Sequence, residues 1–230
     1  SKALKNWHLV ENKRKMPWKG IKDPYKIWLS EVILQQTRVE QGLAYYNRFI
    51  EAYPDVHALA KAPDNQVFKL WEGLGYYSRC RNLIKTAKTV SVEHKGLFPA
   101  SHEGLLSLSG IGNYTAAAIG SFAFGLPLAV VDGNVFRVLS RVFGISDPID
   151  QQKGKLKFEA LANLLLDKKN PASHNQAMMD LGATICKPKN PVCTDCAFSN
   201  KCVAFNKGLQ TEFPQKAKKS KTKERFLYYL

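Results

Sequence analysis

Residues 108–125 read LSGIGNYTAAAIGSFAFG, and this stretch says more about the fold than any other part of the 230-residue chain. Gly110 and Gly112 are separated by one apolar residue, which favours a tight turn between two helices with exposed backbone N–H groups. The second of these helices is predicted over 113–124. Free N–H groups and the helix dipole attract anions, so the turn indicates phosphate contact, although a plain helix–helix turn has the same pattern.

Helical periodicity dominates on both sides of this turn. Asp23 and Pro24 are typical of a helix start, and the segment YKIWLSEVILQQTRVE after them predicts a helix over 24–40. Further helices are predicted over 44–53, 79–94, 101–107, 135–143, 155–167 and 173–185. A strand pattern occurs only in the final RFLYYL. The sequence therefore predicts an all-α protein.

Composition and charge narrow the class of protein. Apolar residues make up 45% and charged residues 23%, which excludes global disorder. No apolar run approaches the ~20 residues of a membrane span. Lys and Arg number 34 against 19 Asp and Glu, a net charge of +15, and the segment 216–225 accounts for only +5 of it. Nucleic acid is the leading partner for such a surface; an anionic membrane or a solubility effect is the alternative.

The cysteines are unevenly distributed along the chain. Cys80 is isolated and is expected to be a plain core or surface residue. The other four, Cys186, Cys193, Cys196 and Cys202, have the spacing C-x6-C-x2-C-x5-C. Four thiolates this close together usually hold zinc or an iron–sulfur cluster, and two local disulfides are the alternative. The spacing alone does not separate iron from zinc.

Several blocks together resemble one family. The hairpin stretch, then AVVDGNVFRVLSR, then the four-cysteine run are similar to the helix-hairpin-helix base-excision glycosylases that carry a 4Fe-4S cluster. SEVILQQTRVE and WEGLGYYSRCRNL narrow the resemblance to the adenine DNA glycosylases (MutY-like), over residues 7–207. The resemblance implies a 4Fe-4S cluster as cofactor. It also implies removal of adenine mispaired with 8-oxoguanine or guanine in double-stranded DNA.

Two carboxylates suit this chemistry, because breaking a base–sugar bond needs an acid for the base and a negative charge near the sugar. Glu31 lies among apolar residues of a predicted helix, and burial would raise its pKa and make it a proton donor. Asp132 precedes a helix whose free N–H groups would keep it ionised. By resemblance, Glu31 protonates adenine and Asp132 faces the sugar. A simple N-cap for Asp132 and an exposed helix position for Glu31 are the alternatives.

Tyr114 and Asn134 complete the predicted catalytic set. Related glycosylases that also cut the strand have a lysine at the position of Tyr114, and its amine attacks the sugar. A tyrosine cannot form a Schiff base, so we expect a monofunctional enzyme; simple packing at the helix start is the alternative. Asn134 resembles a neighbour that orients the Asp132 network, with a turn asparagine as the alternative.

Further contacts follow from the resemblance. Gln36 and Tyr76 match the wedge positions that fill the space left by an extruded base, where core packing is the alternative for the tyrosine. Trp18, Leu34 and Gln176 match the adenine pocket.

Basic residues extend the expected DNA contact. Lys187 and Lys189 lie between the first two clustered cysteines and are expected to contact phosphate, together with the hairpin glycines. Lys19 matches a position that is often arginine, and its role is left open.

The predicted organisation is two helical lobes with a DNA-binding groove between them. One lobe comprises 18–125 with the helix-hairpin-helix, and the other comprises 1–17 and 126–207 with the iron–sulfur cluster. Residues 208–230 are expected to be a basic linker and the start of a C-terminal 8-oxoguanine-reading domain that the chain otherwise lacks. We expect a monomer that does not bind membranes and, if prokaryotic, a cytoplasmic, nucleoid-associated one.

Two other functions fit parts of the pattern. The first is a thymine-glycol or mismatch-thymine glycosylase on the same scaffold. Tyr114 in place of lysine argues against strand cleavage, and Gln176 and the QQT block favour adenine. The second is a non-catalytic DNA-binding iron–sulfur or zinc module. The presence of both Glu31 and Asp132 argues against that module.

Overall fold

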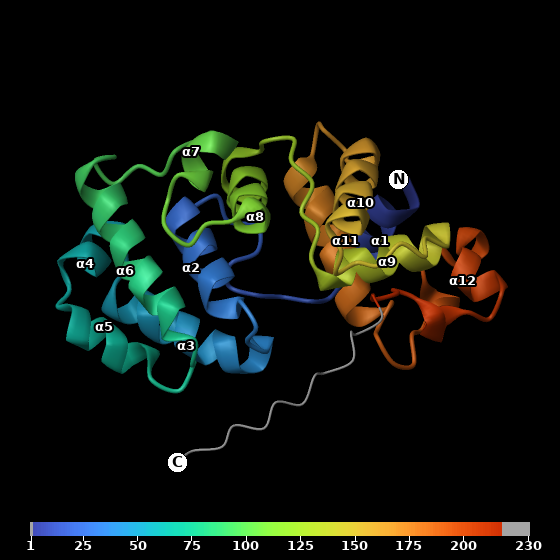
Figure 1. Cartoon of the computed structure of the whole chain (residues 1–230), viewed down its shortest axis with the longest axis horizontal. Coiled ribbons are helices and arrows are strands. Elements are labelled where there is room, and N and C mark those ends of the chain that lie inside the picture. The colour runs from blue at the N-terminus through green and yellow to red at the C-terminus, as the bar shows by residue number, and fades with distance from the viewer. Residues whose placement is uncertain (1, 218–230) are drawn as a thin grey trace, which may run out of the picture.

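The computed structural model describes residues 2–217, which form helices and loops without a β-strand, arranged as two lobes side by side (Figure 1). The first lobe contains α2 (Pro24–Leu34), α3 (Val39–Ala52), α4 (Val56–Lys61), α5 (Asp64–Trp71), α6 (Tyr77–Val92), α7 (His102–Leu106) and α8 (Asn113–Phe124). The second contains α1 (Lys2–Val10), α9 (Gly133–Phe143), α10 (Gln152–Leu165), α11 (Pro171–Thr184), α12 (Val203–Asn206) and three short 3-10 turns, Cys193–Asp195, Ser199–Lys201 and Gln210–Glu212. The all-α, two-lobed prediction is confirmed.

Each lobe has its own hydrophobic core. The first core surrounds the fully buried rings of Trp28, Phe49 and Trp71. The second surrounds Leu4 and Phe158 and joins the N-terminal helix α1 to α9, α10 and α11. Helix α2 is apolar nearly all round, as expected of a helix enclosed by others, and α3, α6 and α8 pack against it. This enclosure is what buries the single carboxylate of α2.

The prediction of one continuous helix over 24–40 is wrong, because the helix is interrupted between 34 and 39. Helix α2 begins at Pro24, capped by Asp23 as expected, but it ends at Leu34 and α3 starts separately. Gln36 has a φ of 54°, in the left-handed region, and the buried guanidinium of Arg79 takes up carbonyls at the end of α2. A tertiary contact therefore overrides the helical periodicity at this point.

The other predicted helices are present, with small differences at their ends. The segments 44–53, 79–94, 101–107, 135–143, 155–167 and 173–185 correspond to α3, α6, α7, α9, α10 and α11. Helices α4, α5 and α12 were not predicted. All three are short, so the apolar period has little length in which to appear.

The hairpin before α8 forms as predicted. Gly110 has a φ of 77°, and a Cβ there would lie 2.7 Å from the Cβ of Asn82 on α6. The hydroxyl of Thr86 donates to the carbonyl of Ser109 at 2.8 Å and fastens the same turn to α6. Gly112 is the N-cap of α8, and no atom within 4 Å would oppose a Cβ there. The turn therefore presents open backbone at a helix N-terminus.

The segment after the cysteines is not a free linker from its start. Phe213 is buried with Cys202 and Ala204, and its carbonyl accepts a hydrogen bond from Nε of Arg141 at 3.1 Å. The strand pattern at 225–230 lies outside the described residues. Among residues 2–217, no helix is long and apolar enough to span a membrane.

Candidate active site

A cavity of about 260 Å³ lies where the two lobes meet. Its walls come from α2 and α8 of the first lobe, from the N-terminus of α9 and from α11 of the second, and from the segment 14–19. Seven predicted site residues line it: Trp18, Glu31, Leu34, Tyr114, Asp132, Asn134 and Gln176. These residues are spread over more than half of the chain, and the packing of the two lobes against each other brings them together.

Glu31 is the buried acid of the cavity. Its side chain is 9% exposed, and burial raises its pKa to about 7, with a further rise from the negative charge of Asp132. A hydrogen bond with Tyr114 acts in the opposite direction but is outweighed. A carboxyl group with this pKa carries a proton for much of the time near neutral pH. It can therefore serve as a general acid.

Tyr114 connects the hairpin to that acid. It is the second residue of α8, directly after the glycine turn, and its side chain hydrogen-bonds to Glu31. Burial and the two nearby carboxylates raise the pKa of the phenol well above its ordinary value. The hydroxyl keeps its proton and acts as a donor, so the position of α8 is linked to the position of Glu31.

Asp132 is both the N-cap of α9 and a cavity residue. Its Oδ1 accepts the backbone N–H groups of Asn134 at 2.9 Å and Val135 at 2.8 Å, and its Oδ2 accepts Nδ2 of Asn134 at 2.7 Å. These bonds and the charge of Arg137 lower its pKa, but burial is the larger effect and the net shift is upward. The N–H groups that we expected to favour the ionised form are in place and lower the pKa, while burial acts against them.

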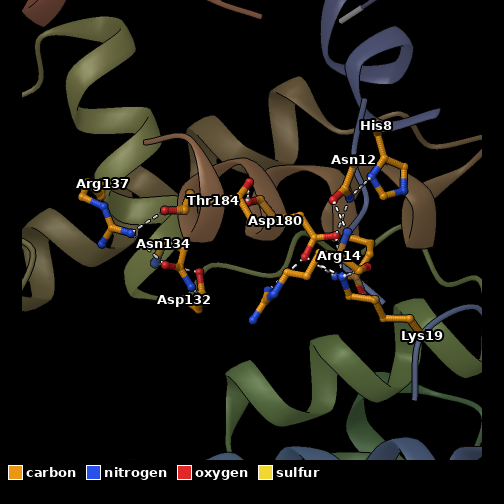
Figure 2. Close-up of polar contacts among 11 residues, drawn as sticks. His8, Asn12, Arg14, Lys19, Asp132, Asn134, Arg137, Asp180 and Thr184 are labelled. Carbon is orange, nitrogen blue, oxygen red and sulfur yellow. Dashed lines mark hydrogen bonds and ion pairs between the residues drawn. The ribbon is translucent and has the colours of Figure 1, made fainter. Parts of the chain in front are cut away.

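Arg137 supports Asp132 from behind and was not predicted from the sequence. Its Nη2 donates to Oδ1 of Asn134 at 2.8 Å (Figure 2). The same nitrogen donates to the carbonyl of Gly182 at 2.7 Å. Its Nε donates to the carbonyl of Cys186 at 2.6 Å. Its spacing of three residues from Asn134 places both on one helix face, which is the signal available in the sequence.

Asp180 organises the opposite wall and was also missed. Its side chain is fully buried and accepts from Arg14 at 2.9 Å, Lys19 at 2.7 Å and Asn12 at 2.7 Å (Figure 2). Gln176, one turn earlier on α11, donates to it through Nε2 at 3.2 Å. A carboxylate only accepts, so it turns the amide nitrogen of Gln176 toward itself and Oε1 away.

This network also defines the position of Lys19. Its ammonium group donates to both oxygens of Asp180 and to the carbonyl of Arg14. Burial lowers its pKa, while the contacts with Asp180 raise it. All three donors of the ammonium group are in use, so Lys19 ties the segment 14–19 to α11.

The four clustered cysteines line one pocket of the second lobe. All four are free thiols, so the disulfide alternative is not what the structure contains. Hydrogen-bond donors reach three of the sulfurs, from Arg141 to Cys186 at 3.4 Å, from the Phe198 N–H to Cys196 at 3.5 Å and from Gln210 to Cys193 at 4.0 Å. Donors aimed at sulfur suit thiolate ligands.

Metal-site geometry is not formed among the described side chains. Within residues 2–217, no group of three or more His, Cys, Asp or Glu side chains lies in an arrangement that could hold a metal ion. Lys187 and Lys189 lie in the loop that follows Cys186, and Arg141 holds this loop through the carbonyl of Lys187 at 2.8 Å.

Gln36 and Tyr76 lie outside the cavity. Both are exposed, Tyr76 to 63%, and both have left-handed backbone angles.

Cys80 is fully buried in the first core. Of the two positions expected for it, core or surface, the structure therefore has the core.

Comparison with known proteins identifies a family and several similar proteins. A family model described as HhH-GPD superfamily base excision DNA repair protein matches residues 29–163. The chain is similar to the adenine DNA glycosylase of Buchnera aphidicola subsp. Schizaphis graminum, with 37% identity over 95% of the chain and 63% of that protein. It is also similar to the human adenine DNA glycosylase, with 41% identity over 88% of the chain and 38% of that protein. The chain thus spans less than two thirds of these relatives.

Two solved structures resemble the fold. A thermostable thymine-DNA glycosylase has a TM-score of 0.81 and 29% identity, covering 90% of this chain and 94% of that one. An endonuclease III–DNA covalent intermediate has a TM-score of 0.75 and 22% identity, covering 90% and 96%, and indicates the fold alone. With the family model matching more than half of its residues, the chain belongs to the HhH-GPD superfamily of base excision DNA repair proteins.

Proposed function

We propose that this chain is the catalytic part of a monofunctional adenine DNA glycosylase that removes adenine paired with 8-oxoguanine or guanine in double-stranded DNA. The observation that carries the proposal is the pair of carboxyl groups, Glu31 and Asp132, which come from different lobes and line one cavity. The similar proteins named adenine DNA glycosylase, at 37% and 41% identity, support adenine over the thymine chemistry of the relative at 29%.

The proposed reaction begins at Glu31. With a pKa of about 7, its protonated carboxyl group donates a proton to a ring nitrogen of the extruded adenine. The base–sugar bond then breaks, its electron pair goes to the base, and adenine leaves as a neutral molecule. The positive charge that develops on the sugar faces the carboxylate of Asp132. Water adds to the sugar, its released proton returns to the Glu31 carboxylate, and an abasic site remains.

The proposed lack of strand cutting rests on Tyr114 and on the hydrogen bonds that hold the amino group of Lys19. Tyr114 offers a hydroxyl group where a nucleophilic lysine would be needed. Lys19 does line the cavity, but its three N–H donors are held by Asp180 and Arg14. An ammonium group in this arrangement has no free lone pair for attack on the sugar. Borohydride reduction of a reaction in progress should therefore trap no covalent protein–DNA complex.

Cys186, Cys193, Cys196 and Cys202 would hold a 4Fe-4S cluster, a proposal supported by the free thiols and by the donors directed at their sulfurs. When bound, the cluster supplies a rigid structural core and no acid, base or nucleophile. Around it, Arg141 keeps the loop of Lys187 and Lys189 in shape, and these lysines contact phosphate. Metal analysis of the purified protein should find iron rather than zinc.

The test is a single-turnover assay with adenine opposite 8-oxoguanine, guanine or thymine, and with thymine opposite guanine as a fourth duplex. Each sample is read with and without hot alkali. Breaks that need alkali and occur only in the first two duplexes support the proposal. Breaks without alkali would place the protein among strand-cutting glycosylases, and release of thymine would favour the thymine-specific alternative. Sedimentation of the protein–DNA complex tests the expected 1:1 monomer.

A further inference from the structure

Two residues other than glycine adopt left-handed backbone angles close to the cavity. Gln36 has a φ of 54° in the turn after α2, and Tyr76 has a φ of 45° directly before α6. Residues with a Cβ rarely adopt such backbone angles, and these angles persist only where the surrounding structure imposes them. Both side chains are exposed. The two turns are therefore held in strained conformations that display one side chain each.

One buried side chain binds both turns. The Nη1 atom of Arg79, on the first turn of α6, donates to the carbonyls of Val32 at 3.1 Å, Ile33 at 3.0 Å and Gln35 at 2.6 Å. Its Nη2 donates to the carbonyl of Leu74 at 3.2 Å. The first three carbonyls lie at the end of α2, next to Gln36, and the fourth lies just before Tyr76. A single guanidinium group thus closes both turns.

The surroundings of Arg79 keep its guanidinium group in place between the two turns. The side chain is 9% exposed and takes part in none of the ion pairs found within residues 2–217. Its charge is balanced by carbonyl dipoles at the C-terminus of α2 and by the faces of Trp71 and Tyr76, whose ring centroids lie 5.1 Å and 5.6 Å from Cζ.

We propose that Arg79 is a positioning residue that sets the turns of Gln36 and Tyr76 as one unit, so that both side chains enter the DNA duplex together when the target base is extruded. The inference rests on the proposed glycosylase function. Insertion of two side chains is faster when they are fixed in advance, because no ordering remains to be done in the complex. Only arginine has the planar donor fork that reaches several carbonyls at once, so lysine cannot replace it.

The test compares wild type with Arg79→Lys, with Arg81→Lys as the matched control, because Arg81 lies on the same helix but is exposed. Base extrusion is followed by the fluorescence of 2-aminopurine next to a target adenosine that carries a 2′-fluorine and resists release. Single-turnover release is measured separately on ordinary adenine. Melting temperature and affinity for undamaged duplex report on the fold and on phosphate contacts.

We expect Arg79→Lys to bind undamaged duplex within about threefold of wild type, because phosphate contacts are unchanged. We expect it to lose the extrusion signal and to release adenine about 30-fold more slowly, a loss typical of misplaced groups. The midpoint of its pH profile should not move, since Glu31 is untouched. Arg81→Lys should match wild type in each measurement.

A cycle with Tyr76→Ala separates positioning from general structural damage. If Arg79 acts through the turn of Tyr76, Arg79→Lys costs less than about threefold once that ring is absent. An equal cost in both backgrounds, or a normal extrusion signal for Arg79→Lys, overturns the proposal. Should Arg79→Lys fail to fold, Arg79→Gln takes its place with the same expected results, because it leaves no unpaired charge in the buried site.

Failure of the proposed function has a different signature. Extrusion by wild type without adenine release would contradict the glycosylase assignment, while loss of the extrusion signal in Arg79→Lys would still support the clamp. Adenine release by wild type together with normal extrusion by Arg79→Lys would leave the function intact and reject the clamp.

Discussion

The side-chain amide of Asn134 donates to Oδ2 of Asp132 at 2.7 Å, so the carboxylate proposed to face the sugar is oriented by its neighbour two residues later. Nη2 of Arg137 donates to Oδ1 of that amide at 2.8 Å, and Nε of Arg137 donates to the carbonyl of Cys186 at 2.6 Å. The orientation of Asp132 is thereby connected to the backbone of the first of the four clustered cysteines.

Arg137→Lys should weaken this connection. A lysine cannot bond Asn134, Gly182 and Cys186 together, and loss of such supporting bonds around a site typically costs about 10- to 100-fold. We expect single-turnover release of adenine to fall by that amount, with iron content measured in parallel. Arg48→Lys on α3 is the control. A normal release rate in Arg137→Lys would mean that Asp132 does not depend on this support.

Glu31→Gln should keep DNA binding and lose base release by about 100-fold or more, because the general acid is removed. In wild type the active form is protonated. With a pKa of about 7 for Glu31, the rate should therefore decline as pH rises through 7. At acidic pH the rate should fall as well, because Asp132, whose pKa is also raised, must stay ionised. A pH–rate profile under single-turnover conditions checks both limbs. A rate that rises as pH increases through 7 would assign the acid to another group.

Glu31 should also make stability depend on pH. Burial raises its folded-state pKa to about 7 from an ordinary value of 4.5, so the folded protein holds this proton more tightly than the unfolded chain does. The associated stability is fully present below pH 4.5 and is lost as pH rises through 7, a change of about 3 kcal/mol. Glu31→Gln should remove this pH dependence, because its side chain stays neutral.

Chemical denaturation at pH 4.5 and pH 8 measures this effect. The free energy of unfolding of Glu31→Gln should exceed that of wild type at pH 8 but not at pH 4.5. Glu51→Gln, at an exposed position of α3, should follow wild type at both. Identical pH dependence in wild type and Glu31→Gln would show that the carboxyl is not desolvated.

Asp132→Asn should separate the capping role of this residue from its charge. Asparagine is as good an N-cap as aspartate, so α9 keeps its start while the negative charge next to the sugar is lost. We expect an unchanged melting temperature and release slowed by about 100-fold. Asp55→Asn, at the N-cap of α4, makes the same exchange away from the cavity and should have normal activity. A slow Asp55→Asn variant would show that the exchange itself harms the fold.

Asp180→Asn should be the most damaging of these changes to stability. The substitution leaves the buried ends of Arg14 and Lys19 without their counter-charge, and breaking a buried pair in this way costs about 3 kcal/mol or more. Asp147→Asn removes a partner of the more exposed Lys157 and should change stability much less. Urea denaturation compares the two. Equal costs would mean that the Asp180 network contributes little.

Those parts of the protein that depend on neighbouring residues are predictable from the amino-acid pattern alone. Helix α8 and its glycine turn, the capping of α2 by Asp23 and of α9 by Asp132, and the run of four cysteines are all local patterns. Each rests on hydrogen bonds or backbone angles within a few residues, and a chain can specify those in any context. The family resemblance added the residues of the cavity.

Features that join distant segments of the chain emerge from the packing of the folded protein and not from local patterns. Helix α2 stops at Leu34 because Arg79 takes its last carbonyls, a contact that no periodicity contains. Asp180 meets Arg14 and Lys19 across more than 150 positions of sequence, and the pKa of Glu31 reflects the burial imposed by surrounding helices. Burial and long-range charge pairing depend on where other elements pack. They therefore become defined only when the two lobes close around the cavity.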